Sequence, residues 1–211
     1  MVETDGSPAS TSRQGRKQRT RRALLDAALA LLEHQSFGAI SLREVAKGAG
    51  ITPTAFYRHF ASMEELGLVL VDESFRSLRD MMREERARVT EPWANIHASS
   101  ETLVRHVREF ETHYRFIARE RAGGVLALRE EISHEIDAFS AELVDDLAGY
   151  PVLENLPRKG LDTLARLIVT VMVGTAERLL DAAPDEDAEI QRENESQMRM
   201  IVTGALQWAT Q

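Results

Sequence analysis

The chain has 211 residues, no cysteine and a formal net charge of −8. This length allows one or two domains with a sizeable core, and the lack of cysteine excludes a disulfide framework and thiolate chemistry. The charge is uneven, since residues 1–60 carry +4 and residues 61–211 carry −12. A basic N-terminal quarter suits a protein that offers only this part to a polyanion, so the acidic total does not argue against nucleic-acid binding.

The first fifteen residues are rich in Ser, Thr, Gly and charged residues, and they lack the apolar stretch of a secretory signal. We expect residues 1–15 to form a disordered arm because they have too little apolar content to pack. The longest uncharged apolar run, Leu167 to Ala176, is only half a membrane span. We therefore expect a soluble, cytoplasmic protein with no membrane partner.

A first helix is predicted from Arg16 to about His34, with its buried face formed by Leu24, Ala27, Ala28, Leu31 and Leu32. Its first residues include five cations and no acidic residue before Asp26: Arg16, Lys17, Arg19, Arg21 and Arg22. Cations are unfavourable at the positive end of a helix dipole, and an anionic partner would relieve them. The alternative is a basic turn that is merely solvated.

Residues 41–60, SLREVAKGAGITPTAFYRHF, predict two short helices joined by a glycine turn. Ser41 and Glu44 have the spacing of a capping box, so a helix should begin at Leu42. Gly48 and Gly50 end it, and Gly50 is best placed for the left-handed backbone conformation. Thr52 then caps a second helix that has a proline at its first position.

The second short helix separates apolar from polar side chains. Phe56 and Phe60 stand four residues apart and can be buried together, which leaves a polar outer face of Thr54, Ala55, Tyr57, Arg58 and His59. Small residues followed by donors suit a helix end that enters a major groove, and we interpret the pair as a helix-turn-helix. An ordinary corner of two helices with a polar outer face is the alternative.

The remaining chain predicts helices and no strands. The expected segments are a long helix from Ser62 to about Val89, helices 92–112, 113–122, 125–148, 161–180 and 188–208, a break at Gly123-Gly124, a loop at 149–157 and an acidic turn at 184–187. Helix 161–180 is apolar almost all round through Leu167–Val173 and must be covered on two sides. With the amphipathic last helix it suggests a four-helix bundle between two subunits, and one self-contained core is the alternative.

The whole arrangement resembles the TetR family of bacterial repressors. The specific part is LREVAKGAGITPTAFYRHF, and the segments EELGLVLVDESF (64–75), FIARERAGG (116–124) and MRMIVTGALQW (198–208) look like the FabR/DesT branch. The resemblance implies an all-α, nucleoid-associated homodimer that binds a palindromic double-stranded operator. It further implies repression of unsaturated fatty-acid synthesis genes and an acyl-CoA or acyl-carrier-protein thioester as effector.

The resemblance also implies roles for individual residues. Thr52, Thr54, Tyr57 and His59 match recognition-helix contacts, with Tyr57 and His59 on phosphates, and Thr20 and Arg43 match supporting positions. The full set of expected DNA-binding residues is Arg16, Lys17, Arg19, Thr20, Arg43, Thr52, Pro53, Thr54, Ala55, Tyr57, Arg58 and His59. Met63 departs from the family, since many members have a lysine there that holds a phosphate. The amides of Met63 to Glu65 are the expected substitute, although Glu64 and Glu65 weaken the field.

No motif for catalysis or for a resident metal or cofactor is present. Glu131 and His134 give one copy of a spacing that di-iron bundles need twice, and there is no H-E-x-x-H, phosphate-binding loop or G-x-S-x-G. We therefore expect neither an enzyme nor a metalloprotein. A helical-bundle enzyme remains an alternative, and it would contain bound metal.

We divide the chain into an arm (1–15), a helix-turn-helix domain (16–61) and an effector-binding and dimerisation domain (62–211). The side chains expected to grip an alkyl chain are Phe75, Met82, Phe110, Phe116, Val169, Met172 and Val173, with Arg119 and Arg121 facing a thioester's phosphates. An effector between the linking helix and the later helices would change the spacing of two DNA-binding heads. Core packing is the alternative for each residue, and a drug-like effector or a ligandless architectural DNA binder is the alternative for the whole.

Overall fold

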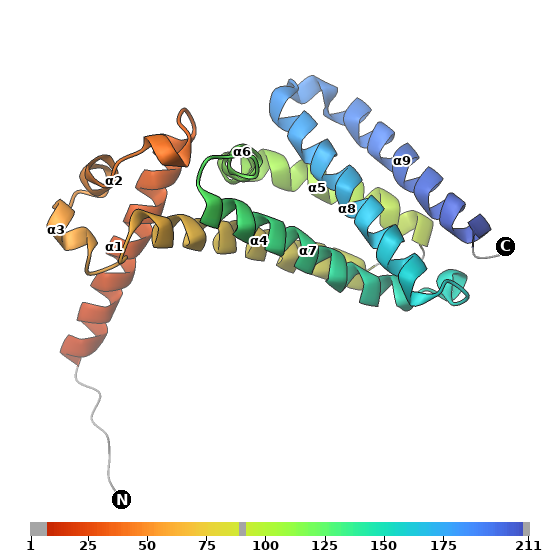
Figure 1. Cartoon of the computed structure of the whole chain (residues 1–211), viewed down its shortest axis with the longest axis horizontal. Coiled ribbons are helices and arrows are strands. Elements are labelled where there is room, and N and C mark those ends of the chain that lie inside the picture. The colour runs from red at the N-terminus through yellow and green to blue at the C-terminus, as the bar shows by residue number, and fades with distance from the viewer. Residues whose placement is uncertain (1–7, 89–91, 209–211) are drawn as a thin grey trace, which may run out of the picture.

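The computed structural model describes residues 8–88 and 92–208, and every regular element in these ranges is a helix. The elements are α1 (Pro8–Leu32), η1 (Phe37–Ala39), α2 (Leu42–Gly48), α3 (Pro53–Phe56), α4 (Met63–Arg88), α5 (Pro92–Glu109), α6 (Glu111–Glu120), α7 (Leu126–Ala148), η2 (Pro151–Leu153), α8 (Arg158–Asp181), η3 (Pro184–Glu186) and α9 (Asp187–Trp208). The all-α prediction is confirmed. Figure 1 shows α1 to α3, the head, at one end of an elongated molecule whose remaining helices, α4 to α9, form the body.

The head has an apolar core to which the body contributes. Its buried residues are Leu24, Leu25, Ala28, Leu29, Leu32, Phe37, Ile40, Val45, Phe56 and Phe60, joined by Leu66, Leu70, Val71 and Phe75 of α4, Phe116 of α6, and Leu128 and Ile132 of α7. The packed core therefore crosses residue 61, the domain boundary that we predicted from the sequence. This crossing matters for function because it joins the head to three helices of the body.

The body packs as adjoining helix pairs. Helix α7 lies against α4 and α8, while α9 lies against α5 and α8, and α4 and α7 run side by side along the length of the molecule (Figure 1). Leu164, Val169, Met172 and Leu179 place one face of α8 in this core, whereas Leu167 on the opposite face is 48% exposed. The sequence predicts that this helix is covered on two sides. The body of the same chain covers one side and leaves Leu167 on the other side partly exposed.

Three helix boundaries differ from our predictions. Helix α1 begins at Pro8 and includes most of the segment that we expected to be a disordered arm, and residues 1–7 lie outside the described part. The break after α5 falls at Phe110 and not after Thr112, and α8 begins at Arg158 and not at Leu161. Because α1 begins at Pro8, Arg16 to Arg22 lie two or more turns inside it. The helix dipole acts mainly on the first turn, so our expectation that it makes these five cations unfavourable is wrong.

Gly67 allows the first turns of α4 to approach η1 and α7 closely. A Cβ atom at this position would lie 2.6 Å from Cζ of Phe37 and 2.9 Å from Cδ2 of Leu128. Glycine is unfavourable in a helix interior, so this position trades helix propensity for contact between the head and the body.

Within residues 8–88 and 92–208, no helix is long and apolar enough to cross a membrane.

Candidate nucleic-acid interface and effector cavities

The helix-turn-helix is held by the local interactions that the sequence predicts. Ser41 Oγ accepts from the Glu44 amide at 3.3 Å, and the Glu44 carboxylate accepts from the Ser41 amide at 2.8 Å, an arrangement that lowers the pKa of Glu44. Gly50 has φ +68°, and Thr52 Oγ1 accepts from the Ala55 amide at 3.3 Å. These contacts confirm both caps and the left-handed glycine.

Helix α3 presents its polar side to solvent. Phe56 and Phe60 are buried with ring centroids 5.8 Å apart, whereas Tyr57 is 62% exposed. Thr52, Pro53, Thr54 and Arg58 are exposed, and Ala55 and His59 are half-buried. The predicted division is therefore confirmed for Phe56 and Phe60 and for Thr54, Tyr57 and Arg58, whereas Ala55 and His59 are less exposed than predicted.

Helix α1 lies across α2 and contributes cations next to α3. A Cβ at Gly48 would lie 2.9 Å from Cβ of Ala27, which shows how closely α1 and α2 approach. Arg16, Lys17 and Arg19 are exposed on α1, as is Arg43 on α2. Thr20 is half-buried, and its hydroxyl donates to the Arg16 carbonyl at 3.1 Å, so Thr20 must give up that bond to donate to a phosphate.

Two of the five cations between Arg16 and Arg22 are structural. The Arg21 guanidinium donates to the His59 carbonyl at 2.7 Å and lies 4.0 Å from the centroid of the Phe60 ring. Arg22 pairs with Asp26 at 2.8 Å and with Glu73 of α4 at 3.1 Å. Arg21 therefore fixes α1 to the end of the recognition segment, and Arg22 fixes α1 to the body.

His59 lies where the cations of the head converge. Burial lowers its pKa, and nearby Lys17, Arg21 and Arg58 lower it further, so the imidazole is neutral near pH 7. Its Nδ1 is buried without a hydrogen-bond partner in the described part of the chain. Lys17 and Arg58 act on the same ring. We therefore treat the exposed residues of this region as one positively charged surface, the head face, which suits a polyanion. It consists of Arg16, Lys17, Arg19, Thr52, Pro53, Thr54, Tyr57 and Arg58.

The start of α4 is partly closed to a phosphate. The Glu65 amide donates to Ser62 Oγ at 3.0 Å, and the Glu65 carboxylate accepts from the Ala61 amide at 2.5 Å. Our expectation that the amides of Met63 to Glu65 substitute for the family's lysine is therefore wrong for Glu65, because its cap has already used that donor.

One cavity lies between α4, α5 and α6 and reaches α1. This junction cavity has a volume of about 340 Å³. Its lining includes the charged residues Arg22, Glu73 and Arg76. It also includes Phe75, Ser77, His106, Phe110, His113 and Tyr114. The volume is at the lower end of the range for small-molecule sites.

Two smaller cavities continue from it into the body. The central cavity, of about 60 Å³, shares Phe75, Leu78 and Tyr114 with the junction cavity and is otherwise lined by apolar residues that include Val169, Met172 and Val173. The distal cavity, of about 80 Å³, shares Phe139 and Met172 with the central one and includes Met82 and Tyr150. The three cavities therefore form a series in which each neighbouring pair shares lining side chains.

The structure places the nine predicted effector residues in different surroundings. Six of them, Phe75, Met82, Phe110, Val169, Met172 and Val173, line one or more of these three cavities. Phe116 packs in the core of the head with its ring centroid 6.3 Å from that of Phe37. The proximity of Phe116 to η1 explains why it does not reach a cavity.

The two predicted phosphate-binding arginines have other partners. Arg119 donates to the Leu32 carbonyl at 2.8 Å and to the Gln35 carbonyl at 2.5 Å, where α1 ends. Arg121 pairs with Glu177 of α8 at 2.9 Å. Arg119 thus satisfies backbone carbonyls of the head, which does not support its predicted role at a thioester. Arg121 lies outside the three cavities, but with its partner Glu177, and with Val169 and Val173, it lines a fourth cavity of about 400 Å³, so its predicted role stays a prediction.

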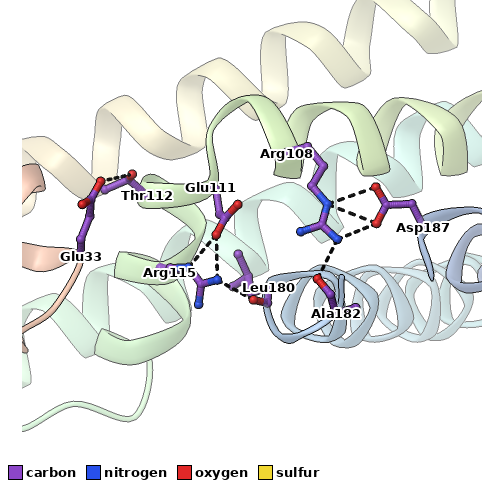
Figure 2. A network of polar contacts seen from close by, with 8 residues as sticks. All are labelled: Glu33, Arg108, Glu111, Thr112, Arg115, Leu180, Ala182 and Asp187. Atoms are coloured by element: carbon purple, nitrogen blue, oxygen red, sulfur yellow. Dashed lines mark hydrogen bonds and ion pairs between the residues drawn. The ribbon is translucent and has the colours of Figure 1, made fainter. Parts of the chain in front are cut away.

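Helix α6 connects the head to the far side of the body. Figure 2 shows Thr112 donating to Glu33, which directly follows α1, and Arg115 donating to Glu111 and to the Leu180 carbonyl at 2.6 Å. In the same view Arg108 binds Asp187 and the Ala182 carbonyl, and Asp187 raises the pKa of this guanidinium. The buried Glu120 accepts from the Phe37 amide at 2.8 Å. The α5–α6 corner therefore contacts α1, α8 and the start of α9.

Sequence reasoning missed three polar residues of the junction cavity, Ser77, His106 and Tyr114. A signal for His106 was available: it falls on the buried stripe of α5, three residues after Leu103 and four before Phe110. A histidine on an apolar stripe must find hydrogen-bond partners when it is buried.

The fold and the head face define a helix-turn-helix protein with an attached helical body that contains cavities. Residues 24–68 match the sequence model of the family described as "Bacterial regulatory proteins, tetR family". The chain therefore carries a TetR-family N-terminal domain, and its fold is TetR-like.

Solved structures with a similar fold include a transcriptional regulator from Rhodococcus sp. Rha1, with a TM-score of 0.69, 21% identity, and coverage of 89% of this chain and 96% of that one. FadR from Bacillus subtilis in complex with stearoyl-CoA has a TM-score of 0.69 at 15% identity and covers 87% and 98%. AibR in complex with isovaleryl coenzyme A and operator DNA has a TM-score of 0.64 at 15% identity and covers 83% and 96%.

Proposed function

We propose that this protein is a cytoplasmic bacterial transcriptional regulator, acting as a repressor, that binds a palindromic operator as a homodimer. The observation that carries the proposal is the head face, which combines exposed cations of α1 with the exposed residues of α3, and where Lys17 and Arg21 both act on His59. A helix end with small residues and donors, flanked by cations, meets the needs of a major groove with phosphates on either side. The expected contacts are the twelve residues predicted from the sequence, with Thr20 in a supporting role.

Dimerisation through α8 and α9 is part of the proposal. Leu167 of α8 is 48% exposed, and Met200 and Trp208 of α9 are 66% and 57% exposed. Exposed apolar side chains on two adjoining helices support a bundle with a second copy of the same pair. Two heads would then read half-sites about one duplex turn, ~34 Å, apart.

A fatty acyl thioester or a similar hydrophobic molecule is the proposed effector. The series of cavities supports it, because the junction cavity continues past Phe75 and Tyr114 into the apolar central cavity. FadR and AibR were solved with acyl-CoA molecules, which supports the same ligand class here. Control of unsaturated fatty-acid synthesis genes, as in the FabR/DesT branch, rests on the sequence segments quoted above and belongs to the proposal.

A mobility-shift experiment on DNA upstream of the protein's own coding region tests the proposal. We expect one retarded complex that resists competitor DNA, weakens steeply with salt, and changes in affinity when saturated or unsaturated acyl-CoAs are added. Lys17→Gln should lower the slope of log affinity against log salt by about one. Lys159→Gln, an exposed substitution at the start of α8, is the matched control and should leave the slope unchanged. Binding without sequence preference would indicate an architectural DNA binder and would overturn the proposal of a sequence-specific regulator.

A further inference from the structure

We infer that the junction cavity recognises an uncharged oxygen acceptor, such as the carbonyl of a thioester, ester or ketone. The donor is a hydroxyl hydrogen of three hydrogen-bonded side chains, Ser77, His106 and Tyr114. These three side chains have one hydrogen more than their two mutual hydrogen bonds need. The inference rests on the proposed effector function and names the chemical group that the effector must bring to this site. It also adds three residues from α4, α5 and α6 to the effector site.

The three side chains form a continuous hydrogen-bonded chain along the cavity. His106 Nε2 lies 3.2 Å from Ser77 Oγ, and His106 Nδ1 lies 3.0 Å from the Tyr114 hydroxyl. His106 is only 3% exposed, and its ring lies against Phe110 with centroids 4.4 Å apart. Packing therefore fixes the imidazole, and all three residues line the cavity.

Counting hydrogens shows what the chain leaves over. A neutral imidazole has one N–H donor and one acceptor nitrogen, and each hydroxyl has one O–H. The chain thus has three hydrogens for two internal bonds. If Nδ1 carries the proton, Ser77 donates to Nε2 and the Tyr114 hydrogen is left over. If Nε2 carries it, Tyr114 donates to Nδ1 and the Ser77 hydrogen is left over.

The pKa values keep this chain uncharged at neutral pH. Burial, with smaller effects from His113 and Arg105, lowers the pKa of His106 to about 4, and burial also lowers the pKa of His113. Burial raises the pKa of Tyr114, so its hydroxyl stays protonated. The group presented to a ligand is therefore a neutral O–H donor.

The charged residues of the lining already have partners of opposite charge, which disfavours an anion as the ligand. Arg22 pairs with Glu73 at 3.1 Å, and Arg76 pairs with Asp72 at 3.2 Å. Asp80, which also lines the cavity, lies 3.6 Å from Arg83. A carboxylate or phosphate would compete with these acidic partners for the guanidinium groups, whereas a carbonyl needs only the unused hydroxyl hydrogen.

The position of Tyr114 decides where the rest of the ligand goes. Its side chain lines both the junction cavity and the apolar central cavity. If a ligand carbonyl accepts from Ser77 or Tyr114, its alkyl tail lies next to Phe75 and Leu78, which line the same two cavities. The charged part of an acyl-CoA would then extend toward solvent past the paired charges at the rim.

Calorimetric titration of the full-length protein with matched ten- or eleven-carbon probes tests the inference. The probes are decanoyl-CoA, methyl nonyl ketone, decanoate and decyl chloride, which differ in the group at one end of the alkyl chain. We expect the Ser77→Ala/Tyr114→Phe double variant to bind the ketone and decanoyl-CoA about tenfold more weakly than the natural protein. Binding of decyl chloride should change by less than about twofold, because it has no carbonyl to lose.

Ser74→Ala is the matched control. Ser74 lines the same cavity, but its hydroxyl already donates to the Leu70 carbonyl at 2.7 Å, so its removal should leave every affinity unchanged. Thermal unfolding and operator binding without ligand show whether the variants fold. Double-variant protein that folds normally and binds the ketone as tightly as the natural protein overturns the inference, and so does tighter binding of decanoate than of the ketone.

The same titrations separate this inference from the proposed function. If the carbonyl probes bind natural and double-variant proteins equally, the recognition by hydroxyl is wrong and an acyl effector stands. If no probe binds the natural protein while the operator still does, the acyl effector is wrong and the inference falls with it.

Discussion

In the head, the buried side chains of α1 to α3 are apolar and the polar ones face solvent, whereas among the described side chains of the body nine polar or charged ones are buried. The body includes a chain in which Ser100 donates to Asn194 at 2.6 Å and Asn194 donates to Thr175 at 2.8 Å. It also contains the junction cavity and the Ser77–His106–Tyr114 chain. The head therefore carries its polar groups on its outer surface, whereas the body also buries polar groups in its interior.

This difference indicates a division of work. A head with a dry, close-packed core keeps one shape, so its outer face can hold donors at fixed positions. A body with cavities and buried hydrogen bonds has interior groups that a ligand can engage, and their satisfaction depends on what occupies the cavity. Helix α6 contacts both regions, because Phe116 lies in the head core while Tyr114 lines the cavities.

The largest expected effect comes from separating the two subunits of the proposed dimer, and with them their two heads. Leu167→Glu places a charge on the exposed apolar face of α8, and we expect a monomer in sedimentation experiments. Operator affinity should fall about 100-fold or more, because the second head no longer binds at a high effective concentration.

Val152→Glu is the matched control for that substitution. Val152 is 47% exposed, close to the 48% of Leu167, but it lies on η2 and not on α8 or α9. We expect it to remain dimeric with full operator affinity. A Leu167→Glu protein that stays dimeric would place the subunit interface elsewhere.

Gly67→Ala tests the contact between the head and the body. The added methyl would meet Phe37 and Leu128 at less than 3.0 Å, and overpacking of this kind costs about 1–3 kcal/mol, against a gain of up to about 1 kcal/mol in helix propensity. We expect a net loss of about 1–2 kcal/mol in the free energy of unfolding, measured by urea denaturation. Adding Phe37→Leu should make the double variant less unstable than the sum of the two single effects, and strict additivity would contradict the close contact.

The buried imidazole of the body predicts a dependence of stability on pH. The pKa of His106 is about 4 in the folded protein against 6.5 for an exposed histidine. The unfolded chain therefore takes up a proton first as the pH falls below 6.5, and folded-state stability decreases down to about pH 4. From pH 7 to pH 5 this amounts to about 2 kcal/mol.

Urea denaturation of the natural protein and of His106→Asn at both pH values measures this effect. The variant should lose about 2 kcal/mol less than the natural protein over the same interval, since carboxylates and His113 contribute equally to both. Parallel losses would mean that His106 is not desolvated in the folded state.

The smallest predicted effect concerns a single donor on the head face. Tyr57→Phe removes a hydroxyl from a side chain that is 62% exposed, and a hydrogen bond to a charged phosphate is worth about 1.5 kcal/mol at the lower end of its range. We expect about tenfold weaker binding to operator and scrambled DNA alike in fluorescence anisotropy. Thr54→Ala should weaken operator binding alone, and equal binding by Tyr57→Phe and natural protein would remove Tyr57 from the phosphate role.

The local interactions of the head could be predicted from the sequence because each spans three or four residues. The capping box of Ser41 and Glu44, the Thr52 cap and the left-handed Gly50 depend on backbone geometry that neighbouring residues determine. The order of the body helices also followed from apolar periodicity. The start of α1 at Pro8 was missed because residues 8–15 have no apolar stripe to indicate a helix.

The partners of charged and polar side chains were decided by the tertiary structure alone. Arg119 and Arg121 have the same charge and lie two residues apart, yet one holds carbonyls at the end of α1 and the other pairs with Glu177. Ser77, His106 and Tyr114 come together from three helices across 29 and eight residues of sequence separation. The sequence by itself determined the helices, their caps and the apolar faces, because these depend on local spacing. Which polar groups meet inside the cavities depends on how those faces pack, and only the folded chain determines that.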